Sequence, residues 1–331
     1  MKKLLAITAL GACALFSTTA TLAAEAGKDL KKVTYLLPAP KFLPAFAPWL
    51  IAQQQGYFAE EGLDVEFVAG KGGVDVAKQV GAGNAVIGGA IGDTPIIVRA
   101  NGIPVKAVAV LGAGSLTLIA SHPESPIDKP AQLKGKTISV MAYTDTTYYS
   151  LLGTMRKAGL TRDDASIQAA GPAGVWQLFA SKKADVMAGV PDWVVSVRAS
   201  GAKVHLMSPS EGFSSMAQAI LASDDAIKNN PELIQKMVRA TLRGMTLIMK
   251  DPDAAVKAYV EANPSFKGKE DQVRQVFDLY NQYVYANQAV PGEMNAERLA
   301  AVQKFYVSEG IVDKAAPLDQ LYTNQFVGAG K

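Results

Sequence analysis

Short apolar runs alternate with helical patterns over residues 33–207, and this alternation restricts the fold more than any other feature of the chain. Strand-like runs occupy residues 33–37, 63–68, 85–90 and 105–111 in a first block, and residues 136–142, 166–169, 184–190 and 203–207 in a second. Helical patterns stand between most of them. Strands that alternate with helices pair mainly in parallel, with helices on both faces of the sheet. The sequence therefore predicts an α/β fold.

Two proline-bearing breaks divide the chain, at residues 121–126 and 208–212. Two breaks around one block indicate that the chain crosses twice between two lobes. After residue 216 the pattern becomes almost entirely helical, with a strongly amphipathic helix over residues 231–249. We expect two lobes, each with a mainly parallel sheet flanked by helices, and a helical C-terminal tail. Residues 27–120 are expected to begin lobe 1, residues 121–212 to form lobe 2, and residues 213–331 to return to lobe 1 and add the C-terminal helices.

The first 26 residues have the layout of a secretory signal. Lys2 and Lys3 precede an apolar run, and small residues allow cleavage near Ala23 or Ala26. The alternative is lipid anchoring through Cys13, because residues 10–13 resemble a lipoprotein processing site. Cys13 is the single cysteine of the sequence. A chain cleaved after it therefore has no disulfide, no thiol nucleophile and no thiolate metal ligand.

Sequence patterns of catalysis are absent from this chain. It contains neither a G-x-S-x-G turn nor a phosphate loop ending in Gly-Lys-Ser/Thr. His122 and His205 are its two histidines, and each is isolated from carboxylates in the sequence. We expect them to be structural, and we expect no catalytic residue, metal or cofactor. A formal net charge of +3 gives no reason to expect a nucleic-acid partner.

Glycine-rich and hydroxyl-rich turns follow several of the predicted strands and open helices. In open parallel sheets, ligands bind beyond the carboxyl ends of the strands, where helix N-termini present free N–H groups. These turns could also be ordinary helix caps, which any α/β fold needs. Because they occur in both blocks, we interpret them as the two sides of a shared cleft. The candidate ligand contacts in them are Gly72, Gly73, Asp93, Thr94, Thr144, Thr146, Thr147 and Asp192.

Aromatic residues stand next to the same turns. Aromatic rings offer large, stiff contact surfaces to a small ligand. The alternative is that they pack helices against the sheets. We add to the candidate contacts Phe42, Trp49, Tyr148, Trp176 and Trp193.

Residues 56–65, Gly-Tyr-Phe-Ala-Glu-Glu-Gly-Leu-Asp-Val, resemble the opening of periplasmic solute receptors of the aliphatic-sulfonate, taurine, nitrate and thiamine-pyrimidine group. Weaker matches follow in the same order, among them Gly72-Gly73, residues 92–95 and residues 230–233. The resemblance implies a two-lobed fold of the second periplasmic-binding-protein type, with ligand in the cleft between the lobes. By position, it places Gly72, Gly73, Asp93, Thr94, Thr146 and Thr147 where such receptors contact ligand.

The resemblance also implies a function and partners. It indicates the periplasmic substrate-binding component of an ABC uptake transporter, which delivers a small ligand to an inner-membrane permease, as a monomer and without catalysis. An organic anion such as a sulfonate or aromatic acid is the favoured ligand, although no arginine clamp is visible in the turns. A thiamine-pyrimidine or another neutral heteroaromatic is the alternative. Fungal pyrimidine synthases resemble these receptors too, and an enzyme on the same fold is a remote third possibility.

Overall fold

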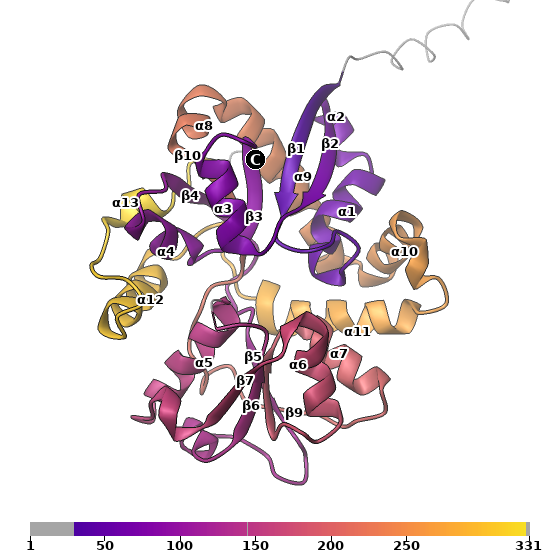
Figure 1. Ribbon diagram of the computed structural model, residues 1–331. Coiled ribbons are helices and arrows are strands. Elements are labelled where there is room, and N and C mark those ends of the chain that lie inside the picture. Colours follow the sequence, from indigo (N-terminus) through magenta and orange to yellow (C-terminus); the bar gives the residue numbers. More distant parts are fainter. Residues whose placement is uncertain (1–29, 144, 329–331) are drawn as a thin grey trace, which may run out of the picture.

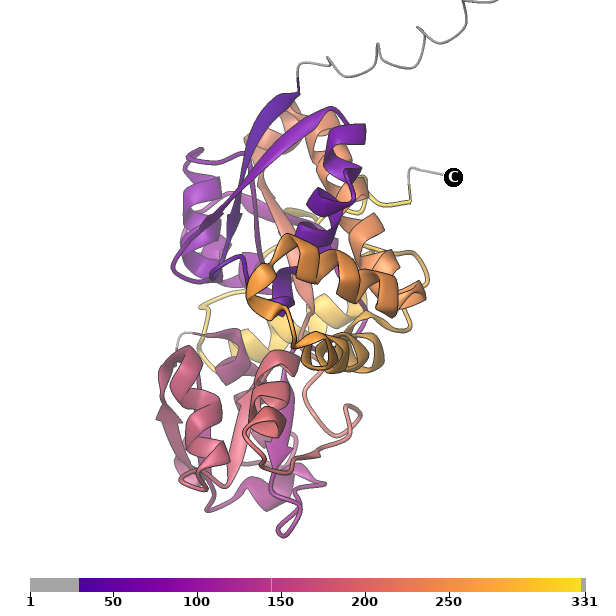
Figure 2. The ribbon, with the colours of Figure 1, turned by 90° about the vertical axis from the view of Figure 1, so that its right-hand side faces the viewer.

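The computed structural model describes residues 30–143 and 145–328. The predicted signal peptide, Cys13 and Thr144 lie outside these described residues. The described part of the chain contains two five-stranded sheets, and each sheet is the centre of one lobe. Figures 1 and 2 show lobe 1 above lobe 2, with helices on both sides of each sheet.

The sheet of lobe 1 has the strand order β2-β1-β3-β10-β4. Strands β1, β2 and β3 run parallel, with Lys31 of β1 opposite Leu63 of β2, and β10 runs antiparallel to both of its neighbours. The strands are β1 (Lys31–Leu37), β2 (Leu63–Ala69), β3 (Ile87–Ile91), β4 (Val105–Val110) and β10 (Gln218–Ser223). The helices that begin after these strands, or connect them, are α1 (Ala47–Gln54), α2 (Tyr57–Glu60), α3 (Gly73–Gly81), α4 (Thr94–Ala100) and α8 (Asp224–Asn229), with a 3-10 turn η1 (Pro44–Phe46) before α1.

The sheet of lobe 2 has the order β7-β6-β8-β5-β9, and here β5 is the strand that runs against its neighbours. Its strands are β5 (Leu118–Ser121), β6 (Thr137–Val140), β7 (Ser166–Ala169), β8 (Val186–Gly189) and β9 (His205–Leu206). Its helices are α5 (Thr146–Arg156), α6 (Gly171–Ala180) and α7 (Pro191–Ala199), with 3-10 turns η2 (Pro130–Leu133) and η3 (Arg162–Asp164). The mainly parallel character predicted for both sheets is confirmed, with one reversed strand in each.

The C-terminal part of the chain supplies helices that cover lobe 1 and reach lobe 2. They are α9 (Pro231–Lys250), α10 (Pro252–Ala262), α11 (Glu270–Tyr280), α12 (Ala296–Ser308) and α13 (Leu318–Leu321), with a 3-10 turn η4 (Pro264–Phe266) and a π-helical segment η5 (Asn281–Tyr285). Helix α9 packs on α1, and α11 contacts both α10 and α7 of lobe 2. In Figure 1, α11 crosses the molecule between the two lobes.

Strand β10 corrects the expectation that the chain after residue 216 is almost entirely helical. All six residues of β10 are buried, and the strand lies between β3 and β4 in the middle of the sheet. A strand buried on both faces has no alternation of apolar and polar residues, so its pattern does not distinguish it from a buried helical segment. Strand β5 was also not predicted; it brings the chain into the second sheet at Leu118, before the break expected at residue 121.

The segment that crosses from β4 to β5 packs closely against η5 and α12. A methyl group on Gly114 would lie 1.8 Å from the carbonyl oxygen of Tyr283 in η5, and one on Gly112 would lie 2.1 Å from that of Val284. Both positions therefore require glycine. Arg298 of α12 donates hydrogen bonds to the carbonyl oxygens of Ser214, Ala113 and Ser215, so its guanidinium joins the two crossing segments.

In the part of the chain that the structure describes, no helix combines the length and the apolar character needed to cross a bilayer.

Candidate ligand-binding site

The carboxyl ends of strands from the two sheets face each other across the junction of the lobes. In lobe 1, β3 ends at Ile91 and leads through Gly92 and Asp93 into α4, while in lobe 2, β6 and β8 lead into α5 and α7. Contacts between lobe 2 and the rest of the chain lie close to these ends. The Ala45 backbone N–H of η1 donates a hydrogen bond of 2.9 Å to Asp192 Oδ1 of α7, and the rings of Tyr149 and Tyr306 lie 5.6 Å apart. These contacts hold the two lobes together where the sequence predicts a cleft.

Asp93 is fully buried at this junction. Its Oδ2 accepts a hydrogen bond of 2.8 Å from the Tyr306 hydroxyl of α12. Its Oδ1 is also buried and accepts no hydrogen bond from any residue that the structure describes. Burial raises the pKa of Asp93 to about 6, against the lowering effect of the Tyr306 hydrogen bond. A half-satisfied buried carboxyl is uncommon in folded proteins, because the unpaired oxygen has lost its water without replacement.

The beginnings of α3 and α4 lie side by side next to Asp93. A methyl group on Gly73 would lie 3.0 Å from the Ala90 side chain and 3.7 Å from Thr94 Oγ1. Gly72 has a φ of 100°, in the left-handed region that favours glycine. Thr94 is buried beside Asp93. The structure therefore brings these four predicted residues of lobe 1 together.

On the lobe 2 side, the turn before α5 is organised by Asp145. Its carboxylate accepts a hydrogen bond of 2.9 Å from the Thr147 backbone N–H, and the Thr147 hydroxyl donates to the same oxygen. This is an ordinary N-cap, so the predicted Thr147 hydroxyl is already used within the protein. Burial raises the pKa of Asp145, and its charge in turn raises the pKa of Asp93. Thr146 is half-buried beside it.

Tyrosine rings connect the α5 turn to α12. Tyr148 is buried and lies edge-on to Tyr143, with 5.4 Å between the ring centres. Tyr149 is half-buried and lies between Tyr148 and Tyr306. The edge-to-face arrangement is the one that aromatic quadrupoles favour. The aromatic surface next to Asp93 therefore comes from Tyr149 and Tyr306 rather than from a tryptophan.

Arg298 carries the positive charge that lowers the pKa of the Asp93 carboxyl. Burial lowers the pKa of Arg298 itself to about 10. All three of its nitrogens donate to the carbonyl oxygens of the crossing segments, as described above. The arginine absent from the predicted turns is thus supplied by the C-terminal tail, but its donors are engaged by the backbone.

Asp192 and Trp193 open α7 at the other side of the junction. Both oxygens of Asp192 are occupied, Oδ1 by the Ala45 N–H and Oδ2 by the Tyr280 hydroxyl at 3.1 Å. Burial raises the pKa of Asp192 to about 6. Trp193 is half-buried, and a methyl group on Gly189 would lie 3.0 Å from its Cε3 atom, so the ring lies against the end of β8. Asp192 therefore connects the lobes through protein contacts.

Three aromatic candidates have contacts with residues other than Asp93. Trp49 is 1% exposed and packs in the lobe 1 core, with its ring centre 5.8 Å from that of Tyr35. Phe42 is 52% exposed, and its carbonyl oxygen accepts a hydrogen bond of 2.6 Å from the Tyr259 hydroxyl. Trp176 is half-buried in α6 and packs against the main core. The packing alternative considered for the aromatics describes Trp49 well.

Two residues of this site were not predicted from the sequence, namely Arg298 and Tyr306. They lie in a tail that was expected only to cover lobe 1. Their separation of eight residues puts them on one face of α12, which was the one available indication.

The histidines have structural surroundings. The ring of His122 stacks on Phe179 with 4.2 Å between ring centres, and its Nε2 lies 3.1 Å from the Ala184 carbonyl oxygen. His205 Nε2 lies 2.8 Å from Asp128 Oδ1 on the surface of lobe 2. Among the described residues, no group of three or more His, Cys, Asp or Glu side chains is placed to hold a metal ion.

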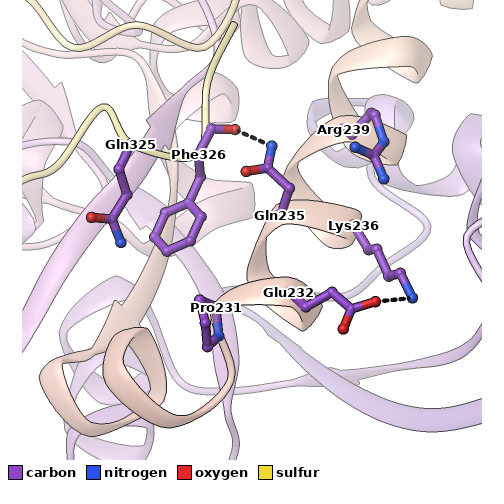
Figure 3. A pocket seen from close by; sticks show the side chains of 7 residues that line it. All are labelled: Pro231, Glu232, Gln235, Lys236, Arg239, Gln325 and Phe326. Atoms are coloured by element: carbon purple, nitrogen blue, oxygen red, sulfur yellow. Dashed lines mark hydrogen bonds and ion pairs between the residues drawn. The ribbon is translucent and has the colours of Figure 1, made fainter. Parts of the chain in front are cut away.

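A groove of about 480 Å³ lies away from the lobe junction, on the outer side of α9. Figure 3 shows its lining, with Gln235 donating a hydrogen bond to the Phe326 carbonyl oxygen and Lys236 paired with Glu232. None of the predicted ligand contacts lines it.

Comparison with known proteins supports the same fold. The chain is 25% identical over 321 residues to the riboflavin-binding protein RibY of Chloroflexus aurantiacus, covering 94% of this chain and 90% of RibY. It is also 25% identical over 301 residues to a 4-amino-5-hydroxymethyl-2-methylpyrimidine phosphate synthase of Aspergillus parasiticus, covering 86% and 84% of the two chains. The solved structure of the alkanesulfonate-binding protein SsuA of Xanthomonas axonopodis, bound to MOPS, superposes with a TM-score of 0.69 at 16% identity, covering 89% of this chain and 98% of SsuA.

The structural match confirms the predicted two-lobed fold of the second periplasmic-binding-protein type. The model of the family described as NMT1/THI5 like matches residues 43–255, which is more than half of the sequence. The chain therefore belongs to the NMT1/THI5-like family.

Proposed function

We propose that this protein is the periplasmic substrate-binding component of an ABC uptake transporter. It captures a small organic ligand between its two lobes and delivers it to an inner-membrane permease. The observation that carries the proposal is the meeting of strand ends from two separate sheets at one junction, with Asp93 and Tyr149 contributed by different lobes. Such a junction can open and close by hinge motion at the two crossings.

Binding without turnover agrees with the chemistry of the described residues. His122 and His205 are engaged in structural contacts and lie in lobe 2, apart from Asp93. The buried Oδ1 of Asp93 can accept a hydrogen bond, and among the described residues the Asp93 carboxyl is hydrogen-bonded to the Tyr306 hydroxyl and to no histidine or lysine. The similarity to a pyrimidine phosphate synthase makes an enzyme the competing function. RibY has the same 25% sequence identity to this chain, and its name describes binding alone.

The protein acts after export, as a monomer that meets its permease at the membrane surface. The signal-like layout of residues 1–26 supports export, and the receptor function requires it.

The test is recovery of a bound ligand in unchanged form. Purified protein is mixed with equimolar riboflavin, 4-aminopyrimidine, methanesulfonate or benzoate. The compound is then recovered, and its molecular mass is measured by mass spectrometry. We expect one of these classes to bind at one molecule per chain and to be recovered intact. A chemically altered compound would overturn the receptor function in favour of an enzyme.

A further inference from the structure

We propose that Asp192 is a proton-operated latch between the lobes. Its carboxyl joins lobe 2 to η1 and α11, and uptake of a proton by this carboxyl favours the joined arrangement of the lobes. The latch consists of Asp192, the Ala45 backbone N–H and the Tyr280 hydroxyl. Closure by these three protein groups does not depend on the ligand, and so it goes beyond the proposed function.

The latch connects three separate parts of the chain at one carboxyl. Asp192 lies in the first turn of α7 in lobe 2. Its Oδ1 accepts a hydrogen bond of 2.9 Å from the Ala45 N–H of η1, and its Oδ2 accepts one of 3.1 Å from the Tyr280 hydroxyl of α11. Helix α7 packs against α11 and η1 around this carboxyl, and Figure 1 shows α11 between α10 and α7. Lobe 2 is therefore joined to two elements outside it.

The partners of the carboxyl are themselves fixed to lobe 1. At the end of α11, Asn281 Nδ2 donates a hydrogen bond of 2.8 Å to the Ile248 carbonyl oxygen of α9. The Tyr259 hydroxyl and Asn263 Nδ2, from α10 and its C-terminal end, donate to the Phe42 carbonyl oxygen just before η1. Helices α9 and α10 both pack on α1 of lobe 1. Separation of the lobes therefore requires the hydrogen bonds to the latch carboxyl to break.

The surroundings of the carboxyl contain phenols and no compensating cation. Asp192 is half-buried, and the titratable groups that face it are Tyr259 of α10, Tyr280 of α11 and Tyr285 of η5. Burial raises the pKa of each phenol, and the negative charge of Asp192 raises it further. From η1 the carboxyl meets the backbone N–H of Ala45. Among the described residues, no lysine or arginine forms an ion pair with this carboxyl, so hydrogen bonds alone offset its charge.

The direction of the proton effect follows from these surroundings. In the joined arrangement, burial raises the pKa of Asp192 from 3.8 to about 6, against the lowering effect of its hydrogen bonds. Once the lobes separate, water reaches the carboxyl and its pKa returns toward 3.8. The joined arrangement therefore holds the proton more tightly, and loss of the proton above pH 6 favours separation. The ratio of separated to joined molecules should rise about tenfold from pH 5 to pH 8.

Under the proposed receptor function, the latch regulates loading. Ligand enters the separated form, and the share of that form is smaller at low pH. Association of a ligand should therefore be slower below pH 6 than above it.

The experiment measures the arrangement of the lobes without added ligand. The protein is freed of co-purified compounds by reversible unfolding in urea. Dyes attached at Lys71→Cys of lobe 1 and Lys134→Cys of lobe 2, both exposed positions, report the fraction of separated molecules by energy transfer. Cys13, the single cysteine of the sequence, lies in the predicted signal. We expect the ratio of separated to joined molecules in the wild type to rise about tenfold between pH 5 and pH 8.

The variant Asp192→Asn is the neutral counterpart of the protonated carboxyl. Its amide oxygen can accept from the Ala45 N–H, and its NH₂ group can donate to the Tyr280 oxygen. The lobes of this variant should stay joined, with a ratio that changes less than about threefold from pH 5 to pH 8. Asp225→Asn, the same change at an exposed first-turn position of α8, is the matched control and should keep the wild-type pH dependence.

A second variant, Tyr280→Phe, tests the latch even if Asp192→Asn folds poorly. It removes a hydrogen bond that lowers the pKa of Asp192, so the rise in the fraction of separated molecules should level off at a higher pH than in the wild type. A hydroxyl with a purely structural role would leave this pH unchanged, and that result would count against the latch.

Two further outcomes would overturn the latch. One is a wild-type ratio that stays constant from pH 5 to pH 8. The other is a tenfold rise that persists in Asp192→Asn, because a different group, such as Asp93, would then carry it. Either outcome leaves the receptor function standing. Recovery of a chemically altered compound would refute the receptor function instead, and it would leave the latch intact because the latch is measured without ligand.

Discussion

The buried carboxyl of Asp93 should make the protein less stable at neutral pH than a variant without it. Asp93→Asn keeps the size and shape of the side chain and removes the charge. The folded-state pKa of Asp93 is about 6, raised from 3.8 mainly by burial. The native state therefore holds this proton more tightly than the unfolded chain does.

The sign of the effect follows from this difference. Well below pH 3.8, the ordinary pKa of the group, the carboxyl is protonated in both states, and its contribution to stability is fully present. That contribution is lost as pH rises to 6, the folded-state pKa. A difference of about two pKa units corresponds to about 3 kcal/mol in the free energy of unfolding at pH 7. Asparagine does not titrate, so Asp93→Asn should gain about 2–3 kcal/mol over wild type between pH 4 and pH 7.

The assay is urea unfolding of wild type and variant at intervals from pH 4 to pH 8. The quantity of interest is the difference between the two proteins, because titration of all other groups cancels in it. Asp64→Asn is the control, since its side chain is exposed and the same substitution there should change stability by about 0.5 kcal/mol or less. A difference between Asp93→Asn and wild type that is the same at pH 4 and pH 8 would refute the reasoning. A gain in stability combined with a loss of binding would mark Asp93 as a residue kept for function.

Three further predictions concern packing and the lobe junction. Gly244→Ala in α9 should lower the free energy of unfolding by about 2 kcal/mol or more, because the added methyl group would lie 2.0 Å from the Pro48 carbonyl oxygen. This loss is expected although alanine favours helices more than glycine does. Thermal unfolding measures it, and an unchanged melting temperature would contradict the close contact between α1 and α9. Tyr280→Phe removes the hydroxyl that donates to Asp192 Oδ2, so it should weaken the contact between the lobes by about 1–3 kcal/mol. The radius of gyration of the ligand-free protein in X-ray scattering should then increase. An unchanged scattering curve would show that this hydrogen bond does not hold the lobes together. Trp193→Ala should weaken ligand binding about 2- to 10-fold through loss of an aromatic contact, whereas a large fall in the ligand-free melting temperature with an unchanged Kd would make Trp193 a packing residue.

Local signals in the sequence were sufficient for the elements that carry one side of the site. Gly72 and Gly73 mark the start of α3 because one of them adopts a left-handed φ, and Asp93-Thr94-Pro95 marks the start of α4 with a polar residue and an early proline. The parallel arrangement of the predicted strands then implies that these turns share one edge of a sheet.

Long-range partners could not be predicted in the same way. The hydrogen bond between Asp93 and Tyr306 joins residues 213 positions apart, and Arg298 reaches Ala113 over 185 positions. Nothing in the local pattern of α12 indicates which strand end its polar side chains meet. Strand β10 was missed for a related reason, since its burial depends on the insertion between β3 and β4 rather than on its own periodicity.

The central claim is that ligand binds between the lobes, and hydrogen–deuterium exchange tests it most directly. Exchange is measured by mass spectrometry with and without a saturating probe that binds. We predict slower exchange in peptides from both sides of the junction, covering residues 92–99 of lobe 1 and 145–156 of lobe 2, with no change over residues 231–239. Slower exchange confined to residues 231–239 and the region of Phe326 would contradict the claim, because it would place the ligand in the groove of Figure 3 on the outer side of α9.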